Sequence, residues 1–235
     1  MEFPKTAIVL AGGMGTRLKS VVSDVPKPLA PINGRPFLEY LLDQLAAQGI
    51  TEVIFAVGYK GKLVEEAFGE EHDCLSLHYS YEPEALGTGG AVQLALGQHN
   101  ADEPVWVING DTFFACDLAT LAKAHHDARP DVTLALHHVD PADRYGVVEL
   151  SNEGLIDRFR EKKAGTAGFI NAGVYLLEPA ALLRFDLGEN FSLERDFFAA
   201  HLEDLRMLGV VSTGFFIDIG IPEDYARAQE VFGKD

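Results

Sequence analysis

The chain has 235 residues, of which 47% are hydrophobic and 23% charged, and its formal net charge is −17. This balance is typical of a globular protein with one large core, which excludes disorder as the default state. The acidity argues against binding of nucleic acids or anionic membranes, which attract basic surfaces. The chain has no apolar run near the roughly 20 residues that span a bilayer, and no signal-peptide layout at its N-terminus. We therefore expect a cytoplasmic protein.

Short apolar runs alternate with amphipathic segments along the first 140 residues. Residues 7–11 are predicted to form a buried strand, and residues 37–48 a helix, because Phe37, Leu41 and Leu45 recur at helical spacing. This β–α alternation predicts a mostly parallel sheet with helices on both faces, which binds ligands at the carboxyl ends of its strands. The other predicted strands of this part are 52–57, 75–80, 105–109 and 132–139, and the other helices are 62–68, 91–97 and 118–128.

The alternation of strands and helices changes after about residue 140, where the predicted strands follow one another more closely. We expect one domain over residues 1–235, in which a smaller mixed sheet from about 141–235 packs on the layer formed by about 1–140. The predicted strands of this second part are 145–150, 155–161, 169–177 and 207–212, and its helices are 193–202 and 222–232.

A glycine-rich loop, residues 11–18 (Ala-Gly-Gly-Met-Gly-Thr-Arg-Leu), directly follows the first strand. Its glycines let the backbone approach a ligand closely, and successive free N–H groups form a nest for anions. Arg17 adds a cation that can grip a phosphate with two N–H groups, and Lys27 is held by the extended segment between Pro26 and Pro28. The spacing matches neither the dinucleotide fingerprint nor a P-loop. On the glycines alone, a plain turn beside two surface cations is an equal alternative.

The wider pattern resembles the sugar-1-phosphate nucleotidyltransferases over nearly the whole chain. The resemblance is carried by Gly12-Gly13-x-Gly15-Thr16-Arg17-Leu18 followed by Lys27-Pro28, and by later segments in the same order. Those segments are 82–90, 109–111, 161–162, 171–173 and 218–220. It implies a Rossmann-like α/β fold of the glycosyltransferase-A-like nucleotidyltransferase type, with nucleotide bound by about 1–140 and sugar phosphate by about 141–235.

A finer resemblance, carried by residues 15–34, 84–90 and 109–114, is to the D-glycero-α-D-manno-heptose-1-phosphate guanylyltransferases. It implies transfer of a nucleotidyl group from GTP to a heptose 1-phosphate, with release of pyrophosphate. The product, GDP-heptose, would serve bacterial surface polysaccharides. Many relatives assemble as dimers or tetramers, so the resemblance leaves self-association open for this chain.

The resemblance also implies roles for single residues. Arg17 and Lys27 would act on the phosphates as catalytic cations, and Asp111 and Asp218 would hold Mg²⁺, which prefers oxygen ligands. The implied nucleotide-binding residues are Ala11, Gly12, Gly13, Gly15, Thr16, Glu82, Gly87 and Thr88. The implied sugar-phosphate-binding residues are Gly146, Glu161, Lys162, Asn171 and Gly173.

Glu82 bears on the choice of base, because thymidylyl- and uridylyl-type relatives often have glutamine near this place. A carboxylate accepts from two N–H groups, which matches the N1–H and amino edge of guanine and not uracil. Residue 82 therefore favours GTP. Thr88 is a candidate cap for the helix that follows. Ile221 departs from the family, since many relatives have threonine there. The missing hydroxyl removes a possible hydrogen bond near the metal carboxylate, and we expect a small effect because Asp218 itself is present.

Three alternatives are weighed against this interpretation. A uridylyltransferase acting on N-acetylmuramate 1-phosphate or another hexose 1-phosphate shares the chemistry. The second is a non-catalytic sugar-nucleotide sensor, and the joint presence of the two cations and two aspartates argues against it. The third is a nicotinamide-dependent oxidoreductase, and the glycine spacing argues against it. Two adjacent histidine pairs, 125–126 and 137–138, are expected to be structural, because neighbours on a helix or strand do not converge on one metal.

Overall fold

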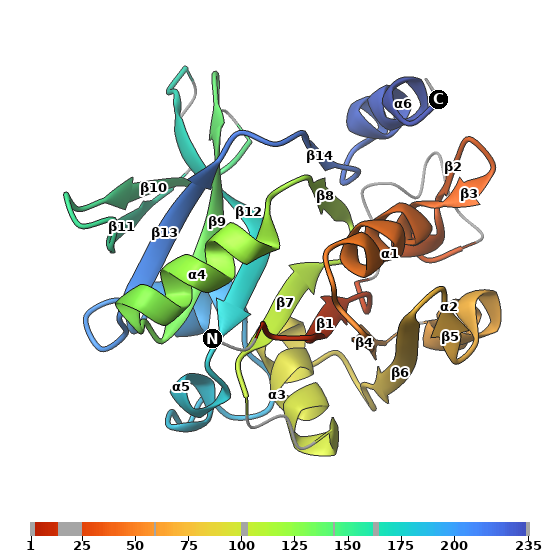
Figure 1. Cartoon of the computed structure of the whole chain (residues 1–235), viewed down its shortest axis with the longest axis horizontal. Coiled ribbons are helices and arrows are strands. Elements are labelled where there is room, and N and C mark those ends of the chain that lie inside the picture. The colour runs from red at the N-terminus through yellow and green to blue at the C-terminus, as the bar shows by residue number, and fades with distance from the viewer. Residues whose placement is uncertain are drawn as a thin grey trace.

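The computed structural model describes residues 3–13, 25–58, 60–99, 103–142, 144–161 and 165–233. Figure 1 shows them arranged around a central twisted sheet, with helices packed against it. The strands of this sheet are β1 (Thr6–Leu10), β4 (Glu52–Val57), β5 (Glu71–His72), β6 (Leu75–Tyr81), β7 (Val105–Asn109), β9 (Val132–Val139), β10 (Val147–Leu150), β11 (Ile156–Arg160), β12 (Gly168–Leu177) and β13 (Met207–Ser212).

The first half of the chain forms the parallel part of the sheet. β1 lies between β4 and β7, parallel to both, and β6 continues beyond β4 in the same direction. The second half extends this sheet instead of forming a separate one, since β12 pairs antiparallel with both β7 and β9. β10 and β11 follow β12 at that edge. The α/β class with a mostly parallel core is confirmed, and its mixed part is continuous with the parallel part.

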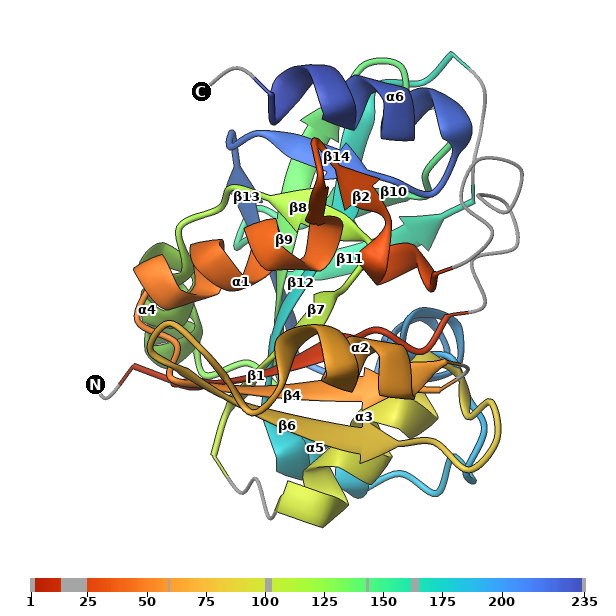
Figure 2. The same ribbon diagram turned by 90° about the vertical axis from the view of Figure 1, so that its right-hand side faces the viewer.

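Helices cover both faces of the sheet (Figure 2). One face carries α1 (Phe37–Ala47), α2 (Gly61–Phe68) and α4 (Leu118–Ala128), and the other carries α3 (Gly87–His99), α5 (Pro179–Leu183) and a π-helix (Leu193–Ala199). Ala7 and Val9 of β1 contribute to the first core, whereas Ile8 contributes to the second. This is the alternation that strand geometry imposes on a sheet buried on both sides.

Two short antiparallel pairs complete the fold. β2 (Pro31–Ile32) and β3 (Arg35–Pro36) flank a turn in which Asn33 and Gly34 have φ of 49° and 84°, so the tight turn expected there is confirmed. β8 (Thr112–Phe114) pairs with β14 (Phe216–Asp218), just before the C-terminal helix α6 (Pro222–Val231). These strands were too short to stand out in the sequence pattern.

Two helices differ from their predicted bounds by more than one residue. α3 begins at Gly87, four residues before the predicted start at 91. The sequence pattern missed this first turn because its glycines have low helix propensity. In the structure, the N–H groups of Gly89 and Gly90 donate to the carbonyl of Phe191, which holds that turn from a distant segment. The helix predicted over 193–202 is a π-helix that ends at Ala199. No helix within the described part of the chain is long and apolar enough to cross a membrane.

Candidate active site

A cavity of about 510 Å³ lies at the carboxyl ends of the parallel strands. β1 ends beside Gly12 and Gly13, β6 ends beside Glu82, and β7 ends at Asn109. Neighbouring parallel strands deliver these residues to the same edge, as expected for ligand sites in such sheets. The other residues that line the cavity are Leu10, Lys27, Pro28, Ala85, Gly87, Thr88, Ala91, Asp111 and Gly220.

Lys27 brings together the two aspartates of the predicted metal site. Its Nζ donates to Oδ2 of Asp111 across 2.5 Å and lies 3.6 Å from Oδ1 of Asp218. The aspartates meet because β8 pairs with β14, which places Thr112 opposite Asp218. Ile219 N–H also donates to the Asp111 carbonyl, so backbone bonds fix the spacing of the carboxylates.

The electrostatics of this group are those of two acids sharing one base. Burial raises the pKa of Asp218, and the charge of Asp111 raises it further, whereas Lys27 lowers it. Gly220 donates its N–H to Oδ1 of Asp218 across 2.7 Å. A Cβ atom at Gly220 would stand 2.8 Å from that oxygen and 3.3 Å from Lys27 Nζ, so only glycine leaves room for this contact.

The first part of the glycine loop packs against Glu82. A Cβ atom at Gly12 would stand 2.3 Å from Oε1 of Glu82, so the carboxylate lies directly over the Gly12 backbone. Oε2 of Glu82 accepts the N–H of Leu86 across 3.0 Å, which fixes the orientation of the carboxylate. Ala11 is buried, and its N–H donates to Ala56, so it supports the loop from below without lining the cavity.

Gly87 and Thr88 line the cavity from the start of α3, and residues 191–194 pack against them there. The sequence did not reveal this packing. Gly87 has φ of +72°, and a Cβ atom there would stand 2.5 Å from the carbonyl oxygen of Phe191. The Thr88 hydroxyl accepts the N–H of Leu193 and donates to Glu194. Thr88 lies within α3, one residue after its first, so its predicted role as the cap is wrong.

The structure places none of the described residues predicted to bind the sugar phosphate on the wall of the cavity. Asn171 and Gly173 are in β12, beside the end of β7, where a Cβ atom at Gly173 would meet Asn109 at 2.6 Å. Gly146 precedes β10, with the Arg160 carbonyl 2.9 Å from where its Cβ would be. Glu161 is exposed just beyond β11.

The remaining predicted site residues, Gly15, Thr16, Arg17 and Lys162, lie outside the described residues. Their roles stay predictions from the resemblance.

Comparison with known families decides the membership of the chain. The family model for "Nucleotidyl transferase" matches residues 6–234. The chain belongs to the nucleotidyl transferase family. Two relatives are D-glycero-α-D-manno-heptose 1-phosphate guanylyltransferases. The one from Aneurinibacillus thermoaerophilus is 43% identical over 95% of this chain and 96% of its own length. The one from Campylobacter jejuni is 43% identical over 93% of this chain and 96% of its own length.

A solved structure agrees with this membership. HddC from Yersinia pseudotuberculosis superposes with a TM-score of 0.86 at 34% identity, over 97% of this chain and 99% of that chain. A second structure of that protein, in complex with GMP-PN, gives a TM-score of 0.85. The α/β fold inferred from the sequence is therefore that of the nucleotidyl transferases.

Sequence reasoning missed one segment of this nucleotidyl transferase, residues 189–194, which packs on the start of α3. Phe191 N–H donates to the Leu86 carbonyl, and Asn190 Nδ2 donates to the Ala85 carbonyl. The phenyl ring of Phe191 would stand 2.1 Å from a Cβ atom at Gly89. The only signal in the sequence was the cluster of glycines at 87–90, which pointed to a ligand and not to a packing partner.

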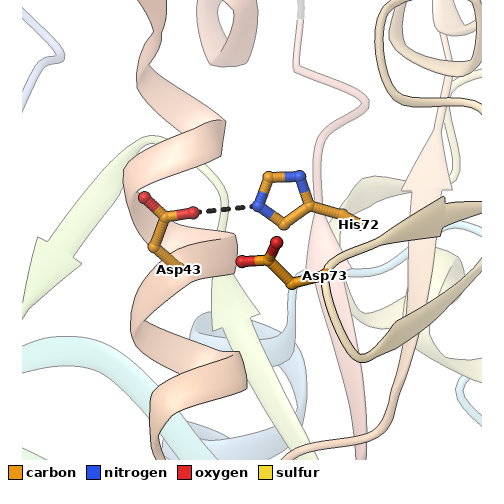
Figure 3. A group of neighbouring side chains, drawn as sticks. All are labelled: Asp43, His72 and Asp73. Atoms are coloured by element: carbon orange, nitrogen blue, oxygen red, sulfur yellow. Dashed lines mark hydrogen bonds and ion pairs between the residues drawn. The ribbon is translucent and has the colours of Figure 1, made fainter.

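A second polar group lies away from the cavity, on α1 and the β5–β6 hairpin. The side chains of Asp43, His72 and Asp73 point toward one another (Figure 3), with potential ligand atoms all within 4.8 Å. Both oxygens of Asp43 are engaged, one by His72 Nε2 at 2.9 Å and the other by Arg35 Nη2 at 2.8 Å. Since the guanidinium already supplies a positive charge, we assign this group a structural role, joining the hairpin to α1.

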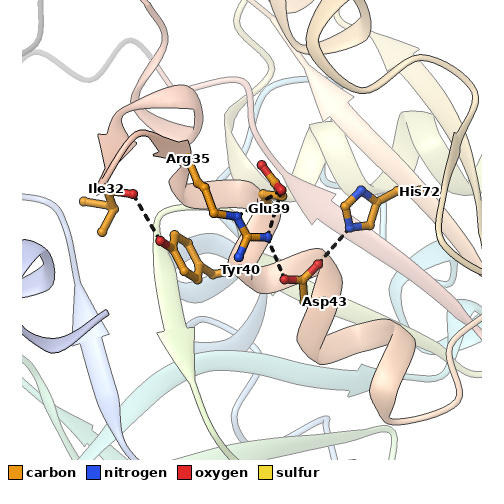
Figure 4. A network of polar contacts seen from close by, with 6 residues as sticks. All are labelled: Ile32, Arg35, Glu39, Tyr40, Asp43 and His72. Carbon is orange, nitrogen blue, oxygen red and sulfur yellow. Dashed lines mark hydrogen bonds and ion pairs between the residues drawn. The ribbon is translucent and has the colours of Figure 1, made fainter. Parts of the chain in front are cut away.

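Figure 4 shows how this network continues along α1. Arg35 also donates to Oε1 of Glu39 across 2.8 Å, and its guanidinium lies 4.6 Å from the ring centroid of Tyr40. Burial raises the pKa of Asp43, but the hydrogen bonds from Arg35 and His72 outweigh it and lower the pKa below its ordinary value.

The members of the two histidine pairs have different surroundings. His125 is buried, with Thr133 Oγ1 2.8 Å from one ring nitrogen and Glu178 Oε1 3.1 Å from the other. His126 is exposed, and His137 stacks on Phe216 with ring centroids 5.3 Å apart. The contacts of His125 and His137 are those of structural residues, as expected.

Proposed function

We propose that this protein transfers a guanylyl group from GTP to D-glycero-α-D-manno-heptose 1-phosphate, giving GDP-heptose and pyrophosphate. The observation that carries the proposal is the placement of Glu82. Its carboxylate lines the cavity between the glycine loop and α3, held by the Leu86 N–H. Acceptor oxygens in that position match the N1–H and amino edge of guanine. The heptose guanylyltransferases that share 43% of their residues with this chain support the same base and sugar.

The reaction needs placement of charge more than a base. A phosphate oxygen of the sugar phosphate attacks the α-phosphorus of GTP, a new P–O bond forms, and the bond to the β-phosphate breaks to release pyrophosphate. Negative charge accumulates at the α-phosphate, and fixed cations lower the barrier. Lys27 Nζ, held by Asp111 and Asp218 on the cavity wall, is such a cation.

A divalent cation fits the same carboxylates. Asp111 and Asp218 offer two hard oxygen donors and carry one charge more than Lys27 neutralises, which is the donor set that Mg²⁺ prefers. We propose that these two aspartates hold Mg²⁺, which when bound would neutralise the phosphate oxygens. By resemblance, Arg17 and Lys162 would bind the phosphates of the two substrates.

Pyrophosphate release with Mg²⁺ present tests the proposal. GTP, UTP, dTTP, CTP and ATP are each combined with heptose, mannose, glucose and N-acetylmuramate 1-phosphates. We expect release with GTP and the heptose phosphate. Release with UTP and an N-acetylmuramate phosphate would retain the chemistry and overturn both substrates, and silence across the grid from folded protein would support a sugar-nucleotide sensor.

A further inference from the structure

The carboxylate of Glu194 joins two parts of the site that are far apart in sequence. On one side, its Oε2 accepts from the Thr88 hydroxyl across 3.1 Å. On the other side, its Oε1 accepts from the Tyr175 hydroxyl across 3.1 Å. Thr88 lines the cavity at the start of α3, and Tyr175 belongs to β12. One side chain on the π-helix thus bonds both to α3 and to β12.

The bonds continue beyond Tyr175 to the predicted sugar residues. Asn171 Nδ2 donates to the Tyr175 hydroxyl across 2.8 Å, and Asn171 Oδ1 accepts the N–H of Gly173 across 3.0 Å. The pairing of β12 with β9 shifts register between Asn171 and Tyr175, so this stretch bulges from the ladder. Side-chain bonds therefore add support to a stretch that has left the ladder with β9, although Val174 still pairs with Ile108 of β7.

Tyr175 is fitted to act as a donor to Glu194. It is fully buried, and burial raises the pKa of its hydroxyl well above the ordinary value, with the charge of Glu194 raising it further. The phenol stays protonated, so it donates one hydrogen bond to Glu194 and accepts one from Asn171. Removing either partner would leave a buried polar group unpaired, which is costly.

The other contacts of Glu194 fix the segment that shapes the nucleotide side. Ser192 Oγ donates to Oε2 of Glu194 across 3.3 Å, and Leu193 N–H donates to Thr88 Oγ1 across 2.8 Å. The preceding residue, Phe191, accepts from the N–H groups of Gly89 and Gly90. A π-helix is a rare geometry that often marks functional positions, and here it aims Glu194 between α3 and β12.

From these contacts we propose that Glu194 is a positioning residue, which sets the nucleotide side through Thr88 and the sugar side through Tyr175 and Asn171. The inference rests on the proposed function for the assignment of the two sides. Glu194 itself is not on the wall of the cavity, so it acts through its neighbours. A displacement of about 1 Å on either side is enough to disturb an in-line transfer.

Steady-state kinetics of Glu194→Gln and Tyr175→Phe test this. The amide keeps the shape of Glu194 but lacks one acceptor, and phenylalanine keeps the ring of Tyr175 but lacks the hydroxyl. For both variants we expect kcat/KM to fall about tenfold to a hundredfold, with the KM of both substrates raised. Since the two residues act as a unit, the double variant should lose less than the product of the single losses.

Two control variants separate positioning from stability. Tyr40→Phe removes another partly buried hydroxyl, which donates to the Ile32 carbonyl, and Glu203→Gln changes an exposed acid on the chain beyond the π-helix. Both should keep KM and kcat within about twofold of the wild type. If Glu194→Gln and Tyr175→Phe lower the melting temperature and leave both KM values as in Tyr40→Phe, the role is structural and the proposal is overturned.

The KM and kcat values of each variant are compared with those of the wild type on the substrates that the wild type turns over. If the wild type turns over another nucleotide or sugar phosphate, the proposed function fails, and the same KM comparison with that pair still tests Glu194. If the wild type uses GTP and the heptose phosphate while Glu194→Gln matches it, only the positioning role fails. A wild type that turns over no pair overturns both.

Discussion

Lys27 and Asp111 are 84 residues apart in sequence, yet Nζ of the lysine lies 2.5 Å from Oδ2 of the aspartate. The Lys27 side chain is largely covered, with 11% of it exposed, whereas 40% of the Asp111 side chain is exposed, and both residues line the cavity. The pair thus presents a fixed positive and a fixed negative charge at the edge where the parallel strands end.

Replacement of Asp111 by Asn should abolish most turnover and leave the fold intact. The amide keeps the size of the carboxylate but removes the charge that would hold Mg²⁺ and Lys27. We expect kcat to fall at least about a hundredfold, because metal neutralisation of a transition state contributes several kcal/mol. Pyrophosphate release measures the loss, and circular dichroism reports the fold. Asp127→Asn, which removes an exposed acid on α4, is the control. Near-normal turnover would remove Asp111 from the metal site.

Replacement of Glu82 by Gln should weaken the preference for GTP. The glutamine oxygen can still accept the Leu86 N–H, so the loop keeps its shape, but one acceptor facing the cavity becomes a donor. We expect the ratio of kcat/KM for GTP over UTP to fall about tenfold or more, since hydrogen-bond mismatches with a base edge discriminate strongly. Steady-state rates with both nucleotides measure it. An unchanged ratio would assign base recognition to backbone groups.

Two glycines of α3 should respond to alanine in opposite directions. At Gly89 the new methyl group would overlap the Phe191 ring, whereas at Gly97 nothing lies within 4 Å. Gly89→Ala should destabilise the protein by about 1–3 kcal/mol through overpacking. Gly97→Ala should stabilise it by about 0.5–1 kcal/mol through helix propensity. Denaturant unfolding of both variants gives the comparison, and equal effects would contradict the packing of segment 189–194 on α3.

The stability contributed by Asp43 should depend on pH. Its pKa is lowered in the folded protein, so its charged form stabilises the fold above its ordinary value of 3.8, and this contribution is lost as the pH falls through the lowered value. At pH 7 we expect Asp43→Asn to be less stable than the wild type by up to about 1 kcal/mol, since exposed ion pairs contribute little.

Urea unfolding of Asp43→Asn at pH 7, 4 and 3 checks this dependence. The difference from the wild type should be largest at pH 7 and should shrink toward pH 3. Asp186→Asn, which changes an exposed acid outside the Arg35–Asp43–His72 network, serves as the control. A difference that grows on acidification would contradict the assigned role of the Arg35–Asp43–His72 network.

Local patterns in the sequence were enough to predict most of the sheet. The strand predicted at 207–212 matches β13, and the one at 132–139 matches β9. The apolar pattern is clear there because β9 has eight residues and β13 has six, and each strand begins with a buried stretch. The same reasoning failed for β8 and β14, which have three residues each and exist because they pair with one another. No local pattern encodes that pairing.

The sequence by itself determined the class of fold, the glycine loop after β1 and the candidate cations and acids, because each follows from residues adjacent in the chain. The tertiary structure decided which of them meet. Pairing of β8 with β14 brings Asp218 to Lys27 and Asp111. Packing of segment 189–194 on α3 explains the glycines at 87–90 and brings Glu194 to Thr88. These contacts join residues from about a hundred to almost two hundred positions apart. Long-range packing, unlike helix or strand periodicity, leaves no repeating signal in the sequence.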